Sequence, residues 1–166
     1  MLAMVEVGGQ GAFALCGRHR YAGGAAMEDR LPNHWLIKSE PFKYSWDQLV
    51  EDGETIWDGV RNHRAANNLR AMKKGDKLFF YHSNKGLEIV GIAKVSEAGL
   101  TDPTDLEGKW PTVKVQPVKK LQRPVTLKEI KADETLEGIE LVRLSRLSVA
   151  EIRPEEWDII IAKSKA

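Results

Sequence analysis

Three successive residues at positions 38–40, Lys38, Ser39 and Glu40, place a cation, a hydroxyl and a carboxylate at the end of an apolar run. In an extended chain, Lys38 and Glu40 share one face and Ser39 points to the other. A carboxylate accepts hydrogen bonds from an exocyclic amino group, which cytosine and adenine carry and thymine lacks. The motif is therefore either a polar rim that reads the edge of a base or a solvated strand end.

Two tryptophans, Trp57 and Trp110, lie at boundaries between predicted elements, and Trp57 directly precedes an Asp58-Gly59 turn. Aromatic faces at such junctions can stack on a base, which is worth about 1–3 kcal/mol per base. Both rings could equally close the ends of a barrel, and the residues alone leave the two interpretations open. The other tryptophans are expected in the core: Trp35, Trp46 and Trp157.

Signatures of catalysis are weak. The four histidines do not pair at metal-ligand spacing, and no phosphate-binding glycine loop or G-x-S-x-G motif is present. A set of Ser39, His82 and Asp58 has the types of a catalytic triad, but any domain of this size offers such a set by chance. We therefore expect a protein that is not an enzyme and that has no metal and no cofactor.

The charge balance argues against a protein that coats nucleic acid through phosphate neutralisation. The 166 residues carry 25 basic and 24 acidic side chains, a formal net charge of +1. A nucleic-acid partner would have to be held by a local patch or pocket. The single cysteine, Cys16, indicates a reducing compartment, and no apolar run approaches the roughly 18–20 residues of a membrane span. We expect a cytoplasmic protein without a signal peptide or membrane partner.

Two parts of the chain differ in composition. Residues 1–33 are rich in Gly and Ala and lack periodicity, which predicts a disordered or weakly ordered extension. Met27 is an alternative start within it. Residues 34–163 alternate apolar and polar segments and are predicted to form a single domain.

The domain is predicted to be α+β, a meander of strands with short helices, which suggests a small, partly closed barrel. Asn84-Lys85-Gly86 joins two strands as a hairpin, and Pro117 marks an edge or a bulge in the next strand. The predicted strands cover residues 34–38, 76–83, 87–98, 110–121 and 144–152.

Helix termini carry clear capping signals. Ser45 and Asn62 are predicted N-caps, and Thr126 with Glu129 forms a capping-box pattern. The helix after Asn62 is predicted to end at a Lys-Lys-Gly signature that closes with Gly75. The predicted helices cover residues 44–53, 62–75, 125–132 and 153–163.

Several segments together resemble one known family. HWLIKSEP, YSWDQL, TIWDGVRN, NNLRAMKKGDKLFFYHS, VGIAKV, DPT and LVRLSRLSV follow one another in the order and spacing of the EVE domain. The resemblance covers residues 34 to about 160. It implies a PUA-like, partly closed β-barrel flanked by short helices, related in fold to PUA and YTH domains.

The resemblance also implies a function: non-catalytic recognition of a modified base that is flipped into an aromatic pocket. For the family, 5-methylcytosine and its oxidised forms in DNA are the ligands usually discussed, whereas the YTH relatives read N6-methyladenine in RNA. The expected partner is thus a nucleic acid that carries a modified base, bound by a monomer. Three alternatives stay open: an RNA reader of the N6-methyladenine type, a sensor of a free nucleoside, and a nucleic-acid-processing enzyme.

By the same resemblance, Trp57 is the stacking wall of the pocket and Trp110 is similar in position to a second wall. Lys38, Ser39, Glu40 and Asn62 correspond to polar readers, and Arg61 is part of the same TIWDGVRN segment. The remaining lining and backbone contacts are expected from Tyr81, His82, Ser83, Arg146 and Ser148.

The chain departs from the family pattern in its second helix. His63 stands where the family more often has an aromatic residue, and Ala66 where it has an arginine. The second departure removes a possible phosphate contact. The loop TDPTDLEGKW is also short, which trims one lip of the expected pocket.

Overall fold

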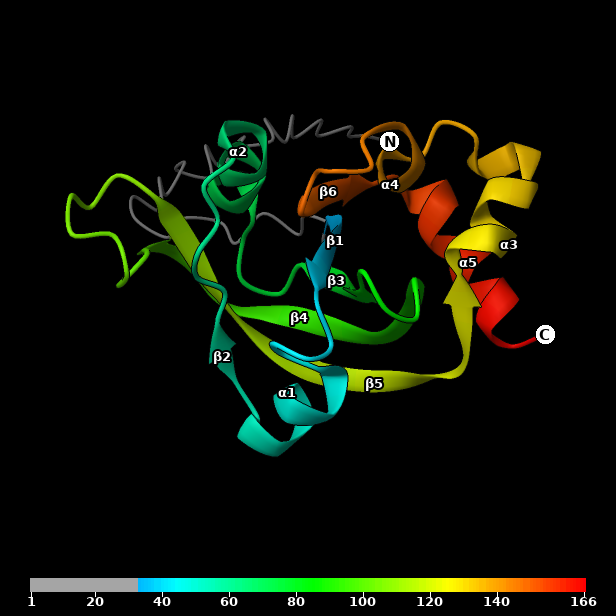
Figure 1. The fold of residues 1–166 in the computed structure, drawn as a ribbon, viewed down its shortest axis with the longest axis horizontal. Coiled ribbons are helices and arrows are strands. Elements are labelled where there is room, and N and C mark those ends of the chain that lie inside the picture. Colours follow the sequence, from blue (N-terminus) through cyan, green and yellow to red (C-terminus); the bar gives the residue numbers. More distant parts are fainter. Residues whose placement is uncertain (1–32) are drawn as a thin grey trace, which may run out of the picture. The chain divides into compact units, whose positions relative to one another are not determined.

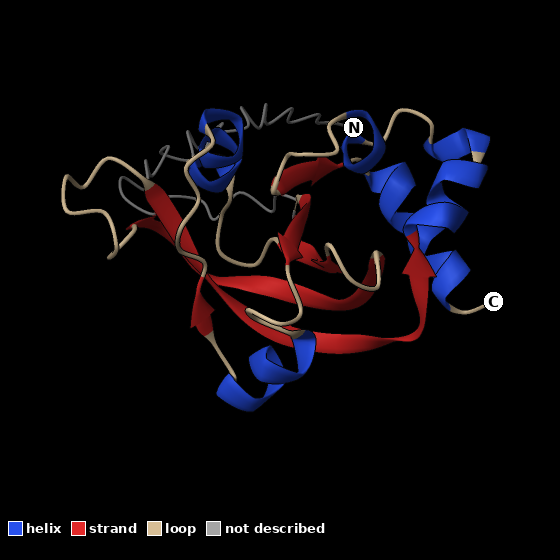
Figure 2. Cartoon of the chain, viewed as in Figure 1, coloured by secondary structure: helices blue, strands red, loops and turns tan. Residues whose placement is uncertain are grey.

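Within residues 33–166, six strands form one mixed sheet in the order β2-β5-β4-β3-β1-β6 (Figures 1 and 2). Strands β3 (Lys77–His82), β4 (Glu88–Thr101) and β5 (Pro111–Thr126) pair antiparallel, as the sequence predicts. This computed structural model describes residues 33–166. The predicted extension over residues 1–33, apart from Asn33, lies outside the described residues.

Strand β1 (His34–Ser39) does not continue the meander. It pairs parallel with β3 and antiparallel with β6 (Val149–Ile152). The parallel register sets Lys38 opposite Tyr81 and Ser39 opposite His82, so two predicted site segments end side by side. Strand β2 (Thr55–Ile56) was not predicted. Strand β6 begins at Val149 and not at the expected residue 144, because residues 144–148 form the turn and bend that follow the helix at residues 140–143.

The predicted helix caps are confirmed. The Ser45 side chain accepts from Gln48 N at the start of α1 (Trp46–Asp52), and Asn62 accepts from Ala65 N at the start of α2 (His63–Ala71). Thr126 and Glu129 form the capping box of α3 (Leu127–Ala132). The described chain also contains a 3-10 helix (Glu134–Leu136), α4 (Glu140–Arg143) and α5 (Pro154–Ser164).

The predicted end of α2 at Gly75 is wrong. The helix ends at Ala71, and Met72 already has an extended backbone. Gly75 instead has φ +93° in the turn before β3, and its N–H donates to Val95 O of β4 at 2.9 Å. The Lys-Lys-Gly signature therefore serves the strand entry, not the helix.

Helix α2 bridges strands from opposite ends of the sheet order. It packs against β5 near one edge of the sheet order and against β6 at the other edge (Figure 1). Its Asn68 side chain donates to Val149 O of β6 at 2.8 Å. This arrangement fixes the start of α2 close to the segment that precedes β6.

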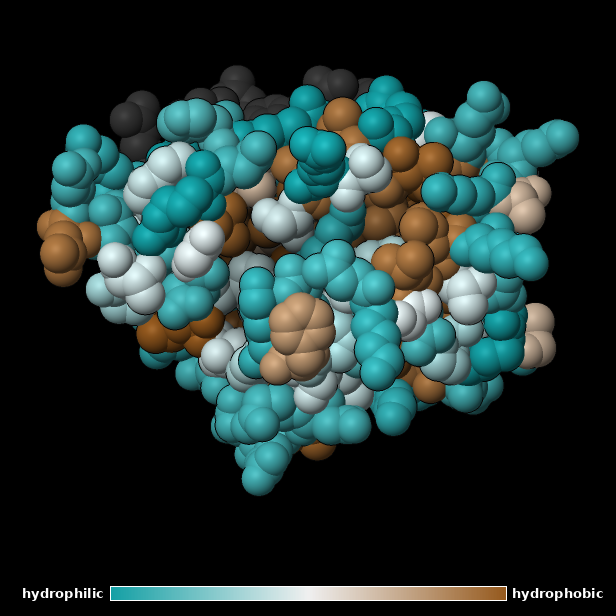
Figure 3. All heavy atoms as spheres, in the orientation of Figure 1, coloured by the Kyte–Doolittle hydropathy of each residue, from teal (hydrophilic) through white to brown (hydrophobic). Residues whose placement is uncertain are grey.

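Aliphatic and aromatic residues together form the core, and Trp35, Trp46 and Trp157 are buried as predicted. Trp46 covers Gly91, where an added Cβ would meet the indole at 2.6 Å, so only glycine fits there. Figure 3 shows that the viewed face is mainly hydrophilic, with apolar groups exposed in a few clusters. Within residues 33–166, no helix is both long enough and apolar enough to cross a membrane.

Candidate functional site

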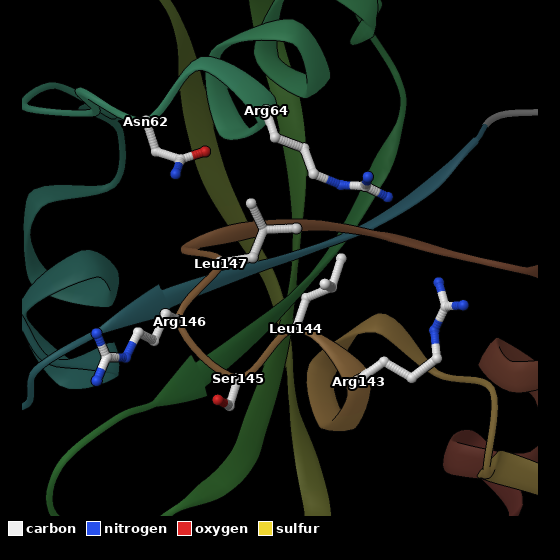
Figure 4. Close-up of a pocket in the computed structure, with 7 residues that line it drawn as sticks. All are labelled: Asn62, Arg64, Arg143, Leu144, Ser145, Arg146 and Leu147. Carbon is white, nitrogen blue, oxygen red and sulfur yellow. The ribbon is translucent and has the colours of Figure 1, made fainter.

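A cavity of about 340 Å³ lies between the start of α2 and the segment that links α4 to β6 (Figure 4). Leu144 and Leu147 provide its apolar surface, and the amide of Asn62 stands at one side. Its lining residues are Asn62, Arg64, Arg143, Leu144, Ser145, Arg146 and Leu147. We call this site the arginine-lined cavity.

Asn62 is fixed by its role as a helix cap. Its Oδ1 accepts from the Ala65 N–H at 3.0 Å, which orients the amide at the cavity wall. Within residues 33–166 no hydrogen bond uses its Nδ2, so this donor is available to a ligand carbonyl or ring nitrogen.

Lys38 connects β1 to the cavity segment. Its ammonium donates to Ser145 O at 2.7 Å, and its backbone N–H donates to Ser148 O at 3.0 Å. The ammonium also lies 5.9 Å from the centre of the Tyr81 ring. Burial lowers the pKa of the Lys38 ammonium and raises the pKa of Tyr81 to about 12. Lys38 thus holds the backbone of the cavity segment at Ser145, and neither Lys38 nor Tyr81 lines the cavity.

Other residues predicted as readers make their polar contacts within the protein. Ser39 Oγ donates to Tyr44 O at 2.5 Å, and the Glu40 carboxylate pairs with Lys43 at 2.9 Å. Ser83 N donates to Ser39 O at 2.9 Å. These residues thus lie together just at or after the ends of β1 and β3. None of them lines the cavity.

His82 belongs to the same group. Its Nε2 accepts from the backbone N–H of Trp46 at 3.2 Å, which requires an unprotonated nitrogen. Burial lowers the pKa of His82, while the nearby Glu88 and Asp47 oppose this shift. The neutral imidazole therefore anchors the start of α1.

Trp57 is buried, with 9% of its surface exposed. The rings of Phe80 and Tyr44 meet it in near-perpendicular geometry, at 5.7 and 6.4 Å between centroids. Its backbone is pinned to β5, because Trp57 N donates to Val113 O and its carbonyl accepts from the Thr112 hydroxyl. Trp57 does not line the arginine-lined cavity. Its role as a stacking wall stays a prediction.

Trp110 lies apart from the cavity in a cluster with Arg61 and His63. The Arg61 guanidinium is 5.6 Å from the centre of the Trp110 ring, and the His63 ring is tilted against it at 5.1 Å. The carboxylate of Asp105 accepts from Trp110 N at 2.8 Å and so fixes the entry into β5.

Asp102 joins this cluster to the turn after Trp57. Its fully buried carboxylate accepts from Gly59 N, the Arg61 guanidinium, and both the N–H and the hydroxyl of Thr104, at 2.6–2.8 Å. Burial alone would raise the pKa of Asp102, but these hydrogen bonds outweigh it and hold the pKa well below its usual range. We call residues 57–61 and 102–110 the Asp102 junction.

The cations of the cavity were only partly expected. Arg146 lines it as the resemblance implied, whereas Arg64 and Arg143 were not predicted. Figure 4 shows that the guanidinium groups of Arg64 and Arg143 approach the same side, while Arg146 points the other way. Ala66 is fully buried on the inner face of α2, and the arginine of this helix that lines the cavity is Arg64.

The spacing of arginines in LVRLSRL was a usable signal for Arg143. Arg64 had none, since an exposed arginine two residues into a helix also occurs as a solvated side chain. No group of three or more His, Cys, Asp or Glu side chains within residues 33–166 is arranged to hold a metal ion.

Comparison with known families identifies the relationship. The model of the EVE domain matches residues 33–163. The chain belongs to the EVE domain family. Among its relatives, thymocyte nuclear protein 1 of Rattus norvegicus is 36% identical over 82% of this chain and 75% of the rat protein. The protein of the same name from Homo sapiens is 34% identical over 80% of this chain and 74% of its own length.

Solved structures agree with this assignment. A protein from Agrobacterium tumefaciens is 46% identical with a TM-score of 0.77, over 80% of this chain and 92% of its own. The human THYN1 protein, crystallised in complex with DNA that contains 5-methylcytosine, is 33% identical with a TM-score of 0.77, over 81% and 98% of the two chains. The predicted α+β, PUA-like fold is confirmed.

The expected likeness to YTH domains extends to the fold alone. The YTH domain of the Zygosaccharomyces rouxii MRB1 protein, solved with N6-methyladenosine RNA, has a TM-score of 0.51 and 18% identity. The match covers 81% of this chain and 88% of that domain.

Proposed function

We propose that this EVE domain protein is a non-catalytic module that holds one modified nucleobase of a nucleic acid, with 5-methylcytosine in DNA as its principal ligand. The observation that carries the proposal is the human THYN1 protein, a homologue of the same fold that was crystallised with DNA containing 5-methylcytosine. The arginine-lined cavity is the place on this chain that suits such a ligand.

The size and chemistry of the cavity support the proposal. A volume of about 340 Å³ lies at the lower end of the range of small-molecule sites, roughly 300–1,000 Å³, and matches a single base or nucleoside. The Asn62 amide can donate to a base, and Leu144 and Leu147 can cover a methyl group. Burial of one methyl carbon contributes about 0.8 kcal/mol, so we expect a modest preference for the modified base over the plain one.

The charges of the cavity fit a base that remains attached to its strand. Arg64, Arg143 and Arg146 line the cavity, and guanidinium groups bind phosphate through paired hydrogen bonds. The net charge of +1 suits the capture of one extruded base, whose unstacking costs a few kcal/mol, better than the coating of a duplex.

A binding panel tests the proposal. Affinities are measured for single- and double-stranded DNA with 5-methylcytosine or cytosine, for RNA with N6-methyladenine or adenine, and for the free nucleosides. We expect 5-methylcytosine DNA to bind tightest, and Leu144→Ser to reduce its advantage over plain DNA. Val118→Ser, an exposed apolar position on β5, serves as the matched control.

Equal affinity for modified and plain bases throughout the panel would refute the proposal. Mass spectrometry of the recovered oligonucleotides tests the absence of catalysis. A product that disappears in Glu40→Gln or His82→Ala would make the protein an enzyme.

A further inference from the structure

We propose that Arg64 is a phosphate-binding residue of the arginine-lined cavity and that Glu140 competes with the phosphate for it. This inference rests on the proposed function, because the phosphate belongs to the strand that carries the bound base. In the free protein, the Arg64–Glu140 ion pair would lower the affinity for nucleic acid.

Arg64 is placed for this role by its helix. It is the second residue of α2, directly after the turn that the Asn62 cap fixes, so the root of its side chain is held at the cavity wall. Its side chain is 58% exposed, and its guanidinium extends toward the side of the cavity where Arg143 lies (Figure 4). A long, exposed arginine can change partners without moving the backbone.

Glu140 is the fixed member of the pair. One carboxylate oxygen pairs closely with the Arg64 guanidinium, and the other accepts from Glu151 N on β6 at 2.9 Å. Its side chain is only 13% exposed. The backbone hydrogen bond keeps the carboxylate in place when Arg64 turns toward a ligand.

Arg143 shows what Arg64 would be without this partner. It lies three residues after Glu140 on α4, is exposed, and has no ion pair or side-chain hydrogen bond within residues 33–166. A phosphate at this side of the cavity can bind Arg143 directly, but it can bind Arg64 only after that arginine has left Glu140. The net affinity of the phosphate for Arg64 is therefore lowered by the loss of the Arg64–Glu140 ion pair.

Four proteins test this exchange: wild type, Glu140→Gln, Arg64→Ala and the double variant. The probes are an oligonucleotide with one 5-methylcytosine and the free nucleoside 5-methylcytidine, which has no phosphate. Exposed ion pairs are worth about 0.2–1 kcal/mol, so Glu140→Gln should bind the oligonucleotide up to about fivefold tighter. Arg64→Ala should bind it about tenfold more weakly, as expected for a charge-assisted hydrogen bond. Affinity for the nucleoside should not change in either variant.

The double variant separates release of Arg64 from a general change in charge. It should bind like Arg64→Ala, because without Arg64 the loss of Glu140 frees nothing. Glu51→Gln, exposed on α1, makes the same change in net charge away from the cavity and should have no effect. A gain that persists in the double variant overturns the proposal, as does a Glu140→Gln variant that binds no better than wild type.

A second measurement is independent of the Glu140 variant and its stability. Loss of one phosphate contact should make the dependence of log K on log salt shallower by about 0.7–0.9 in Arg64→Ala. An unchanged slope overturns the inference while leaving the proposed function intact, provided that the wild type binds the modified oligonucleotide. A wild type that binds none of the oligonucleotides overturns both.

Discussion

Arg61 and Arg146 were both predicted as binding residues, yet the structure uses them in opposite ways. In the Asp102 junction, Arg61 donates to Asp102, to the Thr104 hydroxyl and to Val60 O. In the arginine-lined cavity, Arg146 is exposed and has no ion pair or side-chain hydrogen bond within the described chain. The first arginine is part of the scaffold, and the second is available to a ligand.

The difference separates a region that stabilises the fold, the Asp102 junction, from a region with side chains free to bind a ligand, the arginine-lined cavity. A buried carboxylate such as Asp102 is tolerated only when its oxygens are fully hydrogen-bonded, so the junction must be complete for the chain to fold. Exposed cations such as Arg143 and Arg146 contribute little to folding, and in the proposed function they serve the ligand instead. Variants in the junction should therefore affect stability, and variants in the cavity should affect affinity.

The largest effect is expected from Trp57→Ala. Removal of this buried indole should lower the free energy of unfolding by about 3–5 kcal/mol, since it leaves a cavity against Phe80 and Tyr44. Urea denaturation followed by circular dichroism measures the change, with the partly exposed Trp110→Ala as the comparison. A loss below about 1 kcal/mol would mean that Trp57 belongs to a ligand site and would break the division.

Asp102→Ala should follow, with a loss of about 2–3 kcal/mol, because four donors from Gly59, Arg61 and Thr104 lose their acceptor. Asp58→Ala, at an exposed position in the same turn, should stay within about 0.5 kcal/mol of wild type. An equal cost for the two variants would contradict the structural role of Asp102.

The same carboxylate predicts an acid dependence. The pKa of Asp102 is lower in the folded protein than its ordinary value of 3.8, so its contribution is fully present above that value. It is lost as the pH falls below 3.8 toward the folded pKa. Wild type should thus lose more stability than Asp102→Ala between about pH 4 and pH 2.

Local signals in the sequence predicted the fold well where they were decisive. The caps Ser45 and Asn62 and the hairpin at residues 84–86 depend on neighbouring residues, and all three are confirmed. The parallel pairing of β1 with β3 joins residues 43 positions apart, and β2 has only two residues. Nothing in the local pattern distinguishes such pairings from a simple meander.

The site shows the same limit. Asn62 and Arg146 line the cavity, and both could be predicted because they belong to family segments that are recognisable in the sequence. Arg143 lies in the same segment as Arg146, whereas Arg64 is brought beside them by the packing of α2 against β6, which no single stretch encodes. The family pattern predicted the kind of site, and only the tertiary structure brought its cations together.

Arg143→Ala and Arg146→Ala should each weaken binding of the modified oligonucleotide about tenfold, which corresponds to about 1.4 kcal/mol. Their free energies of unfolding should stay within about 0.5 kcal/mol of wild type, because neither side chain has a protein partner in the described residues. Lys128→Ala, exposed on α3, removes a charge away from the cavity and should leave affinity unchanged. Equal losses in all three variants would indicate general attraction between charges, and the cavity would then hold no particular phosphate.

The smallest effect is expected from pH and sharpens the boundary between the two regions. The pKa of His82 is lowered from 6.5 by burial, so the folded state takes up its proton less readily than the unfolded chain. The contribution of the neutral ring is complete above pH 6.5 and declines as the pH falls below it, toward the folded pKa. Urea denaturation between pH 7.5 and 5 should therefore show a small loss in the free energy of unfolding, which His82→Gln abolishes.

Affinity for the modified oligonucleotide should not follow this titration. His82 accepts from Trp46 N and does not line the cavity, so a ligand there does not contact the imidazole. Measurement of the dissociation constant over the same pH range, in wild type and His82→Gln, separates the two possibilities. If affinity titrated with His82 while stability did not, the ends of β1 and β3 would belong to the binding surface. His82 would then be a binding residue and not a structural one.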